Sequence, residues 1–155
     1  MRLAIEARRI GYRVAYALLA IYWLIRRPRL HGVKCVLTDK EDRVLLVRHT
    51  YGPRGWDLPG GGIKRGEEPL TTARREIEEE LGLTIDDWVS LGKVMTSVYR
   101  RHDTLHCFQA EVDNPQITPD LGEIAGTGWF PQHDLPHNLG RLVRLVLARL
   151  DPSLG

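Results

Sequence analysis

The segment RREIEEELGL, residues 74–83, decides the fold, and its main feature is a run of glutamates. Successive residues of an α-helix turn by about 100°, so Glu76, Glu79 and Glu80 share an arc of about 100°. Glu78 falls on the other side of the helix and is expected to face solvent. Like charges at this spacing repel by roughly a few tenths of a kcal/mol per pair. Three converging carboxylates therefore favour a bound cation, and a solvated acidic face is the simpler alternative.

The apolar residues of this segment lie beside the acidic arc and anchor the helix. They recur at helical spacing, and they are Leu70, Ala73, Ile77 and Leu81. The pattern predicts a helix from Pro69 to Leu81 that is ended by Gly82. A cluster of carboxylates without thiol or histidine suits a hard divalent ion such as Mg²⁺ or Mn²⁺.

A glycine-rich loop precedes the predicted helix. The stretch WDLPGGGIKRGE, residues 56–67, contains three consecutive glycines and a fourth after Arg65. Glycines allow the backbone to approach a ligand closely. Lys64 and Arg65 add positive charge to the same loop. A close-approach loop, basic side chains and a carboxylate-bound metal ion together suit a phosphate or pyrophosphate group.

The loop and the helix together form one long motif. Residues 61–83 match G-x5-E-x7-R-E-U-x-E-E-x-G-U at every fixed position, where U is an aliphatic residue. On this motif the sequence resembles the Nudix family. A weaker resemblance is carried by VLLVRH before the motif and by residues 123–136 after it, so that the resemblance covers roughly residues 32–150.

The resemblance implies both a fold and an activity. The implied fold is an α/β domain, an α/β/α sandwich with a mixed sheet, and an extra helix precedes it. The implied function is metal-dependent hydrolysis of the pyrophosphate linkage in a nucleoside diphosphate linked to another moiety, such as a nucleoside triphosphate, ADP-ribose or a sugar nucleotide. The implied cofactor is Mg²⁺ or Mn²⁺. The alternative is a non-catalytic Nudix-fold nucleotide-binding sensor, which a degenerate motif would favour.

Positions in the motif imply roles for single residues. The implied metal ligands are Glu76, Glu79, Glu80 and the carbonyl group of Gly60. Arg75 would orient the carboxylates by ion pairing, and Glu67 would brace the loop. Gly61 and Gly82 complete the structural positions of the motif.

The general base differs among members of the family, so two carboxylates are candidates. Glu79 is our choice within the motif. Glu123, on a later loop, is the candidate for a second base or an extra metal ligand, and a surface acid is the alternative interpretation of it. Asp120 is a weaker candidate.

Substrate contacts are less well encoded. The candidates for binding phosphates, a sugar or a base are Arg48, Arg54, Lys64, Arg65 and Trp56, with His49, Arg100, Arg101 and His102 as further possibilities. The indole of Trp56 fits a core position as well as a stacking one. No second motif identifies the physiological substrate.

Positive charge is concentrated at the N-terminus. Residues 1–30 contain seven arginines and one acid and therefore carry +6, and because the chain totals +2, the rest carries −4. Bulk charge thus gives no reason to expect specific nucleic-acid binding. We divide the chain into an N-terminal helix, residues 1–30, and a Nudix hydrolase domain, residues 31–155.

The N-terminal helix carries an apolar seam with alternating spacings of four and three residues. The seam consists of Leu3, Ala7, Ile10, Val14, Ala17, Ile21 and Leu24, and Pro28 ends the helix. The uncharged run from Val14 to Ile25 is about 18 Å long, too short for a hydrocarbon core of roughly 30 Å. We expect the helix to pack on its own domain or on a sister subunit in a homodimer. Peripheral contact with an anionic membrane surface is the alternative.

The remaining segments predict strands around one or two helices, which indicates a single α/β or α+β domain. Strands are expected at 32–38 and 43–49 as a hairpin, at 91–100 and 104–112, and briefly at Trp129 and Phe130, with a closing helix at 139–150. Cys35 and Cys107 lie in apolar runs and are expected to be buried free thiols, which fits a reducing cytoplasm.

Overall fold

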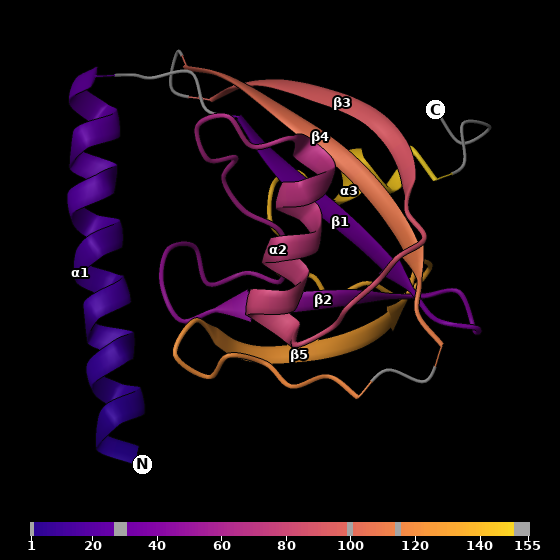
Figure 1. The fold of residues 1–155 in the computed structure, drawn as a ribbon, viewed down its shortest axis with the longest axis horizontal. Helices are drawn as coiled ribbons and strands as arrows, with labels where there is room; N and C mark the ends of the chain where they lie inside the picture. Colours follow the sequence, from indigo (N-terminus) through magenta and orange to yellow (C-terminus); the bar gives the residue numbers. More distant parts are fainter. Residues whose placement is uncertain (1, 27–30, 99–100, 114–115, 151–155) are drawn as a thin grey trace.

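A mixed five-stranded sheet forms the centre of the molecule (Figure 1). The computed structural model describes residues 2–26, 31–98, 101–113 and 116–150. In chain order the elements are α1 (Arg2–Arg26), β1 (His31–Thr38), β2 (Arg43–His49), α2 (Pro69–Leu81), β3 (Val89–Val98), β4 (Arg101–Glu111), β5 (Ile124–Pro131) and α3 (Val143–Leu147). The strand order is β3-β4-β1-β2-β5, with β1 parallel to β4 and the other pairs antiparallel. The expected α/β fold with a mixed sheet is confirmed.

The two strands predicted as a hairpin pair only beside their turn. The register of β1 with β2 consists of Thr38 opposite Val44, whereas β1 pairs with β4 along its whole length. β2 instead pairs along its length with β5. The two central strands therefore diverge from a common turn, and a wedge opens between them.

The glycine-rich loop occupies the edge of β1 that this divergence leaves unpaired. The amide of Val33 donates to the carbonyl oxygen of Gly61, and the amide of Cys35 donates to that of Pro59, both at 2.9 Å. Buried backbone groups need such partners, so the loop completes the ladder that β2 leaves incomplete. The sheet thus holds the loop directly against its centre.

The sheet is covered on both faces, as the expected sandwich requires. Alternate residues of a strand point to opposite faces. Cys35 and Leu45 share a buried cluster with Ile77 of α2. Val36 belongs to a second buried cluster with Val146 of α3. The α/β/α arrangement is confirmed, and α2 is anchored by the apolar side that its spacing predicted.

The closing helix is shorter than predicted. It was expected over residues 139–150, whereas α3 spans Val143–Leu147. The residues before it are engaged by Trp56, whose amide donates to the carbonyl of Asn138 at 2.7 Å and whose carbonyl accepts from the amide of Gly140 at 2.6 Å. A segment held in a β-bridge with Trp56 cannot also be helical, so tertiary pairing overrides the helical spacing at the start of the predicted helix.

Two strands begin earlier than predicted, and one is longer. β3 starts at Val89 and β4 at Arg101, and β5 runs from Ile124 to Pro131 rather than covering only Trp129 and Phe130. Arg100 lies outside the described residues, as do the side chains of residues 101 and 102.

Both cysteines are buried and free, as expected, and burial raises the pKa of the Cys35 thiol well above its ordinary value.

The helix α1 stands beside the domain and contacts it with polar and aromatic side chains (Figure 1). The guanidinium of Arg8 pairs with the carboxylate of Asp120 at 2.6 Å. The ring of Tyr12 stacks on that of Tyr51, with 5.7 Å between centroids. The helix therefore packs on its own domain, but not with its apolar seam.

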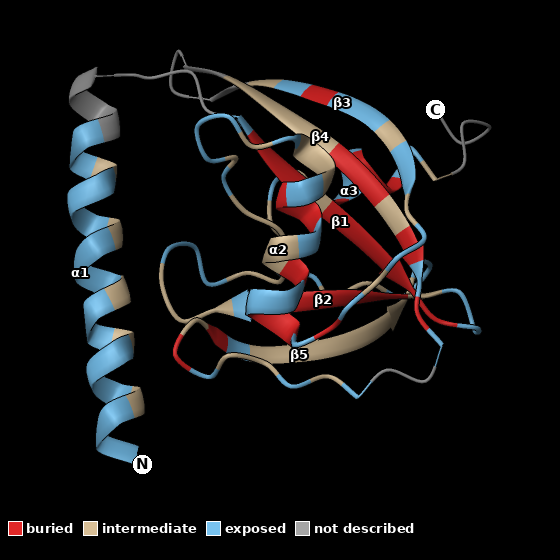
Figure 2. Cartoon of the chain, viewed as in Figure 1, coloured by how far each residue is buried: buried red, intermediate tan, exposed pale blue. Residues whose placement is uncertain are grey.

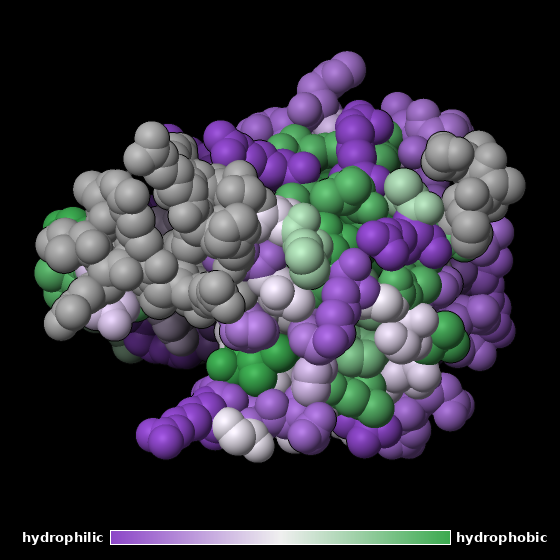
Figure 3. Space-filling view, turned by 90° about the horizontal axis from the view of Figure 1, so that it is seen from above, coloured by the Kyte–Doolittle hydropathy of each residue, from purple (hydrophilic) through white to green (hydrophobic). Residues whose placement is uncertain are grey.

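The seam of α1 faces away from the domain. Its exposed members include Leu3, Ile10, Val14 and Ile21. Figure 2 shows the half-buried residues of α1 on the side toward the domain, and Figure 3 shows apolar side chains at the outer edge where α1 lies. Packing of this face on a sister subunit stays a prediction. Within the described part of the chain, no helix is long and apolar enough to cross a membrane.

Candidate active site

The most deeply buried acid of the molecule's described part is Glu80, near the C-terminal end of α2. Its side chain is 1% exposed, and its carboxylate lies beside the glycine-rich loop and the end of β2. The amide of Gly60 donates to its Oε2 at 3.1 Å. Burial and, after it, the negative charge of Glu123 raise the pKa of Glu80 well above its ordinary value. A buried carboxylate is costly unless donors or positive charges stabilise it, and so few of them surround Glu80 that a further partner is expected.

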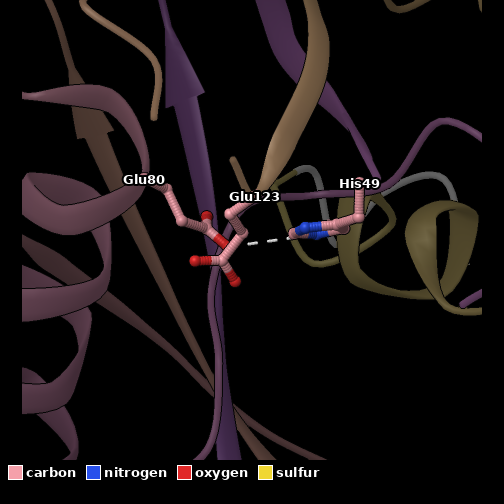
Figure 4. A group of neighbouring side chains, drawn as sticks. All are labelled: His49, Glu80 and Glu123. Atoms are coloured by element: carbon pink, nitrogen blue, oxygen red, sulfur yellow. Dashed lines mark ion pairs between the residues drawn. The ribbon is translucent and has the colours of Figure 1, made fainter. Parts of the chain in front are cut away.

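Glu123 is brought to Glu80 by the loop before β5. The carbonyl of Glu80 accepts from the amide of Asp120 at 3.0 Å, and the carbonyl of Asp120 accepts from the amide of Glu123 at 3.0 Å. The loop therefore satisfies the C-terminal end of α2 and turns back toward it. The hydroxyl of Tyr51 donates to Oε1 of Glu123. The two carboxylates consequently point toward one another (Figure 4).

His49, at the end of β2, completes this group. Its Nε2 lies 3.9 Å from Oε1 of Glu80, and one ligand atom from each of His49, Glu80 and Glu123 lies within 4.8 Å of the others. Burial, and then the charge of Lys34, lower the pKa of His49 to about 4, so the imidazole is neutral at pH 7. The sequence predicted a cluster without histidine, and the structure places one against it. The reason is tertiary, because β2 ends beside the C-terminal half of α2.

Arg75 gathers the other acids of the motif. Its Nε and one terminal nitrogen donate to both carboxylate oxygens of Glu67, at 2.8 and 2.9 Å. The other terminal nitrogen donates to Glu76 at 2.7 Å and to Glu79 at 3.0 Å. The carbonyl oxygen of Gly62 accepts a further bond at 3.2 Å. One guanidinium thus contacts three glutamates and the loop, and its role in orienting metal ligands stays a prediction.

Glu67 braces the loop through several donors. In addition to Arg75, the hydroxyl of Thr72 donates to it at 2.8 Å and the amide of Lys64 at 3.1 Å. The hydrogen bonds from Arg75 and then Thr72 lower the pKa of Glu67 to about 2. The carboxylate therefore stays ionised over the whole physiological range.

Two glycines of the loop, Gly60 and Gly61, are required by close contacts. A Cβ atom at Gly61 would lie 2.4 Å from the carboxyl carbon of Glu76, and one at Gly60 would lie 2.2 Å from the carbonyl oxygen of Val33. Gly60 also has a φ of +141°. Gly82 follows α2 with a φ of +66°, as the predicted helix end requires.

The four glutamates of the run occupy different environments. Glu78 is exposed, as its place on the helical wheel predicted. Glu76 is half-buried, and burial raises its pKa. The side chain of Glu79 is 54% exposed and is held by Arg75. Among the described residues, the group of three possible ligands whose atoms lie within 4.8 Å of one another consists of Glu80, Glu123 and His49.

These donors fit a hard divalent cation. Carboxylate oxygens are the ligands that Mg²⁺ and Mn²⁺ prefer, and a neutral imidazole nitrogen is compatible with Mn²⁺. Glu80 and Glu123 lie together where their repulsion already raises the pKa of Glu80, and a cation between them would remove that cost. The Nδ1 atom of His49 is buried and has no hydrogen-bond partner among the described residues.

Comparison with known proteins fits this geometry. A family model described as the NUDIX domain matches residues 28–150. The chain belongs to the Nudix family. In fold, the Nudix domain is similar to the crystal structure of the MutT Nudix hydrolase from Burkholderia pseudomallei, with a TM-score of 0.71 and 25% identity over 79% of this chain and 98% of that one.

Two curated Nudix relatives match shorter stretches. The chain is 35% identical over 108 residues to an ADP-ribose pyrophosphatase of Mycobacterium tuberculosis, which covers 64% of this chain and 52% of that protein. It is 42% identical over 55 residues to an RNA pyrophosphohydrolase of Rhodospirillum rubrum, which covers 36% of this chain and 33% of that protein. The chain thus spans about half and about a third of the length of these two relatives.

Two hollows of about 430 and 450 Å³ adjoin the acidic group of this Nudix domain. Both are lined by His49, Tyr51 and Arg54, and Arg48 lines the first. The predicted contacts Lys64 and Arg65 are exposed on the loop and line neither of the two. Sequence reasoning missed Tyr51 altogether, since no local pattern connects it with Glu123.

Trp56 is placed as a packing residue. Its ring meets that of Phe130 edge-on, with 4.9 Å between centroids, and the guanidinium of Arg48 lies 4.7 Å from its ring centroid. It also packs against the buried cluster around α3. This supports the core interpretation of Trp56, and stacking on a substrate base stays a prediction.

Proposed function

We propose that this chain is a metal-dependent hydrolase that cleaves the pyrophosphate linkage of a nucleoside diphosphate linked to another moiety. The observation that carries the proposal is the buried carboxylate of Glu80, which faces Glu123. Within the described ranges it accepts a hydrogen bond from the amide of Gly60, and the neutral imidazole of His49 lies 3.9 Å away. The intact Nudix motif around it and the pyrophosphatase names of two relatives support the same activity.

The metal ligands would come from α2 and the two loops beside it. We assign Glu76, Glu79 and Glu80 to Mg²⁺ or Mn²⁺, directly or through water, with Glu123 and the carbonyl of Gly60 completing the set. A bound divalent ion neutralises pyrophosphate charge and lowers the pKa of water attached to it. Arg75 would hold Glu76 and Glu79 in their orientations through its two hydrogen bonds.

Two carboxylates remain candidates for taking the proton of the attacking water. Glu79 is the more exposed, so its free oxygen is open to solvent. Glu123 has one oxygen bound by Tyr51 and lies within the close group with Glu80, which favours a ligand role. We therefore propose Glu79 as the general base and Glu123 as an additional ligand.

The substrate would lie where the acidic group meets the hollows lined by basic residues. Arg48 and Arg54 border these hollows and would contact its phosphates. Lys64 and Arg65, on the exposed loop, would contact a part of the substrate that extends beyond it, and Trp56 is the candidate for a base contact. No specific binding of nucleic acid is expected from the charge distribution.

A hydrolysis screen tests the proposal. The full chain is incubated with Mg²⁺ or Mn²⁺ and nucleoside triphosphates, ADP-ribose, sugar nucleotides and dinucleoside polyphosphates, and the products are identified. We expect turnover that chelation abolishes, and a loss of orders of magnitude in Glu80→Gln with the fold retained. Nucleotide binding without turnover of any substrate would favour the non-catalytic sensor instead.

We also propose a setting for the activity. The two buried free thiols fit a reducing cytoplasm. The exposed seam of α1 fits a homodimer through this helix, and peripheral contact with an anionic membrane is the alternative.

A further inference from the structure

The hollow of about 430 Å³ lies between α1 and the end of β2, and its lining is strongly basic. Arg9 and Arg13 come from α1, and Arg48 and Arg54 come from β2 and the loop after it. None of the residues that line this hollow is an acid. Four arginines line this opening, and the guanidinium of one of them, Arg48, also lies over the ring of Trp56. Positive charges gathered in this way repel one another, and an anion would relieve that repulsion.

These guanidinium groups are poorly neutralised by the protein. Arg9 pairs with Glu6 at 3.0 Å. Arg13 donates to the carbonyl oxygen of Thr50 at 3.2 Å, which leaves its charge in place. In the described ranges, neither Arg13 nor Arg48 nor Arg54 forms an ion pair with a carboxylate.

The basic hollow directly adjoins the acidic group. His49 and Tyr51 line the hollow, and the same two side chains contact Glu80 and Glu123. The acidic group and the basic hollow are therefore joined by these two shared side chains. A ligand with one pyrophosphate at the acidic group would extend further negative charge into the hollow.

We propose that Arg9, Arg13, Arg48 and Arg54 form a subsite for phosphate groups beyond the pyrophosphate that is cleaved. This makes α1 part of the substrate-binding surface. The inference rests on the proposed function and names its substrate class as a phosphate-rich nucleotide, such as a nucleoside triphosphate or a dinucleoside polyphosphate. A nucleoside diphosphate linked to an uncharged sugar would leave the part of the subsite on α1, Arg9 and Arg13, unused.

The placement of α1 supports this role. Arg8 pairs with Asp120 at 2.6 Å, and Arg9 donates to the carbonyl oxygen of Leu121 at 3.1 Å. The rings of Tyr12 and of Tyr16, 5.5 Å away, both pack on Tyr51. The helix is thus held against the loops of the acidic group, and the same contacts present its arginines to the hollow.

Binding of inorganic tripolyphosphate to the full chain tests the subsite without catalysis. Calorimetry in the presence of a chelator removes any contribution of a metal ion. We expect Arg13→Gln and Arg54→Gln each to weaken binding by about tenfold, the loss typical of one charge-assisted hydrogen bond. Arg13→Lys should retain most of the affinity, and Arg144→Gln, an exposed arginine of α3, should retain all of it.

Arg13 belongs to α1, whereas Arg54 does not. A similar loss of affinity in both variants would therefore reflect the subsite and not a change in how α1 docks. Equal tripolyphosphate affinity in the wild type, Arg13→Gln and Arg54→Gln would overturn the proposal. So would a loss that Arg144→Gln shares, because general surface charge would then explain it.

Steady-state kinetics test the named substrate class. We expect Arg13→Gln to raise KM for a nucleoside triphosphate by about tenfold with little change in kcat, and to leave KM for ADP-ribose unchanged. Equal changes for both substrates would overturn the selectivity. If no substrate is turned over, the proposed function fails, while the tripolyphosphate titration still decides whether the subsite exists.

Discussion

Tyr51 donates a hydrogen bond to Oε1 of Glu123 across two loops that are far apart in the sequence. Burial, and then its bond to Glu123, raise the pKa of Tyr51 above its ordinary value, so that its phenol stays protonated and remains a donor. The bond fixes one oxygen of Glu123 and leaves the other available. Because Tyr12 of α1 stacks on Tyr51, the orientation of a proposed metal ligand depends on the N-terminal helix.

The change Tyr51→Phe tests this relationship. The phenylalanine ring keeps the stacking with α1 but removes the donor, so we expect kcat/KM to fall by about tenfold, the effect of one hydrogen bond to a charged group. The midpoint of urea unfolding should move little. Tyr22→Phe, on an exposed part of α1, is the matched control and should behave as wild type. Full activity of Tyr51→Phe would show that Glu123 is oriented without the phenol.

Gly61 and Gly62 offer a matched pair of substitutions. A Cβ atom at Gly61 would lie 2.4 Å from the carboxyl carbon of Glu76, whereas one at Gly62 would meet no atom within 4 Å. Gly61→Ala must therefore displace Glu76, and a shift of about 1 Å at a catalytic group costs roughly a hundredfold in rate. We expect Gly62→Ala to keep near-normal turnover. Similar rates for the two variants in an initial-velocity assay would refute the argument from the close contact.

Much of this site was predictable because it is local. The motif places Glu67, Arg75 and Glu76 at fixed intervals on one loop and one helix, and the structure joins them through a single guanidinium. The exposed position of Glu78 followed from the same helical geometry. Where a contact lies within one loop–helix unit, sequence spacing is close to spatial spacing.

The other half of the site was not predictable, because it is assembled across the fold. His49 reaches Glu80 only because β2 diverges from β1 after a shared turn. Tyr51 reaches Glu123 because β5 pairs with β2 and brings the two loops together. No periodicity in the sequence encodes where two strands separate.

In the N-terminal helix, contacts with the domain decide which face packs, and the apolar pattern does not. Its heptad spacing made the apolar seam the obvious packing face. The structure instead turns Arg8 and Tyr12 toward the domain, where Asp120 and Tyr51 provide an ion pair and a stacking ring. Helical spacing identified the two sides of α1 but not which of them the domain would bind.

The turn between β1 and β2 is held by Asp39 and gives a pH-dependent prediction. Its carboxylate accepts from the amides of Glu41 at 3.1 Å and Arg43 at 2.9 Å, and from Nε of Arg43 at 2.7 Å. Burial alone would raise the pKa of Asp39, but the hydrogen bonds from Arg43 outweigh it and lower the pKa. A group with a lowered pKa in the folded state stabilises the fold above its ordinary pKa.

We therefore expect Asp39→Asn to lower the free energy of unfolding by about 1 kcal/mol at pH 7. The difference from wild type should shrink as the pH falls below about 4, the ordinary pKa at which the unfolded chain takes up a proton, and on through the lower pKa of the folded state. Urea unfolding of the two proteins at pH 7 and at a pH below about 4 measures this difference. Asp42→Asn, in the same turn with a φ of 55° that asparagine tolerates, is the control. A difference that is constant with pH would refute the electrostatic explanation.

The exposed seam of α1 predicts self-association that one charge should disrupt. Val14 is 54% exposed and Ile10 57% exposed on the face that the domain leaves uncovered. Burying this face against a second copy would remove apolar surface from water, and an aspartate there would have to be desolvated in the interface. We expect Val14→Asp to halve the molar mass measured by light scattering, while Leu145→Asp, an exposed apolar residue of α3, leaves it unchanged. If the wild type is already a monomer, the seam does not mediate a dimer. Binding to anionic vesicles then tests whether the exposed seam contacts a membrane instead.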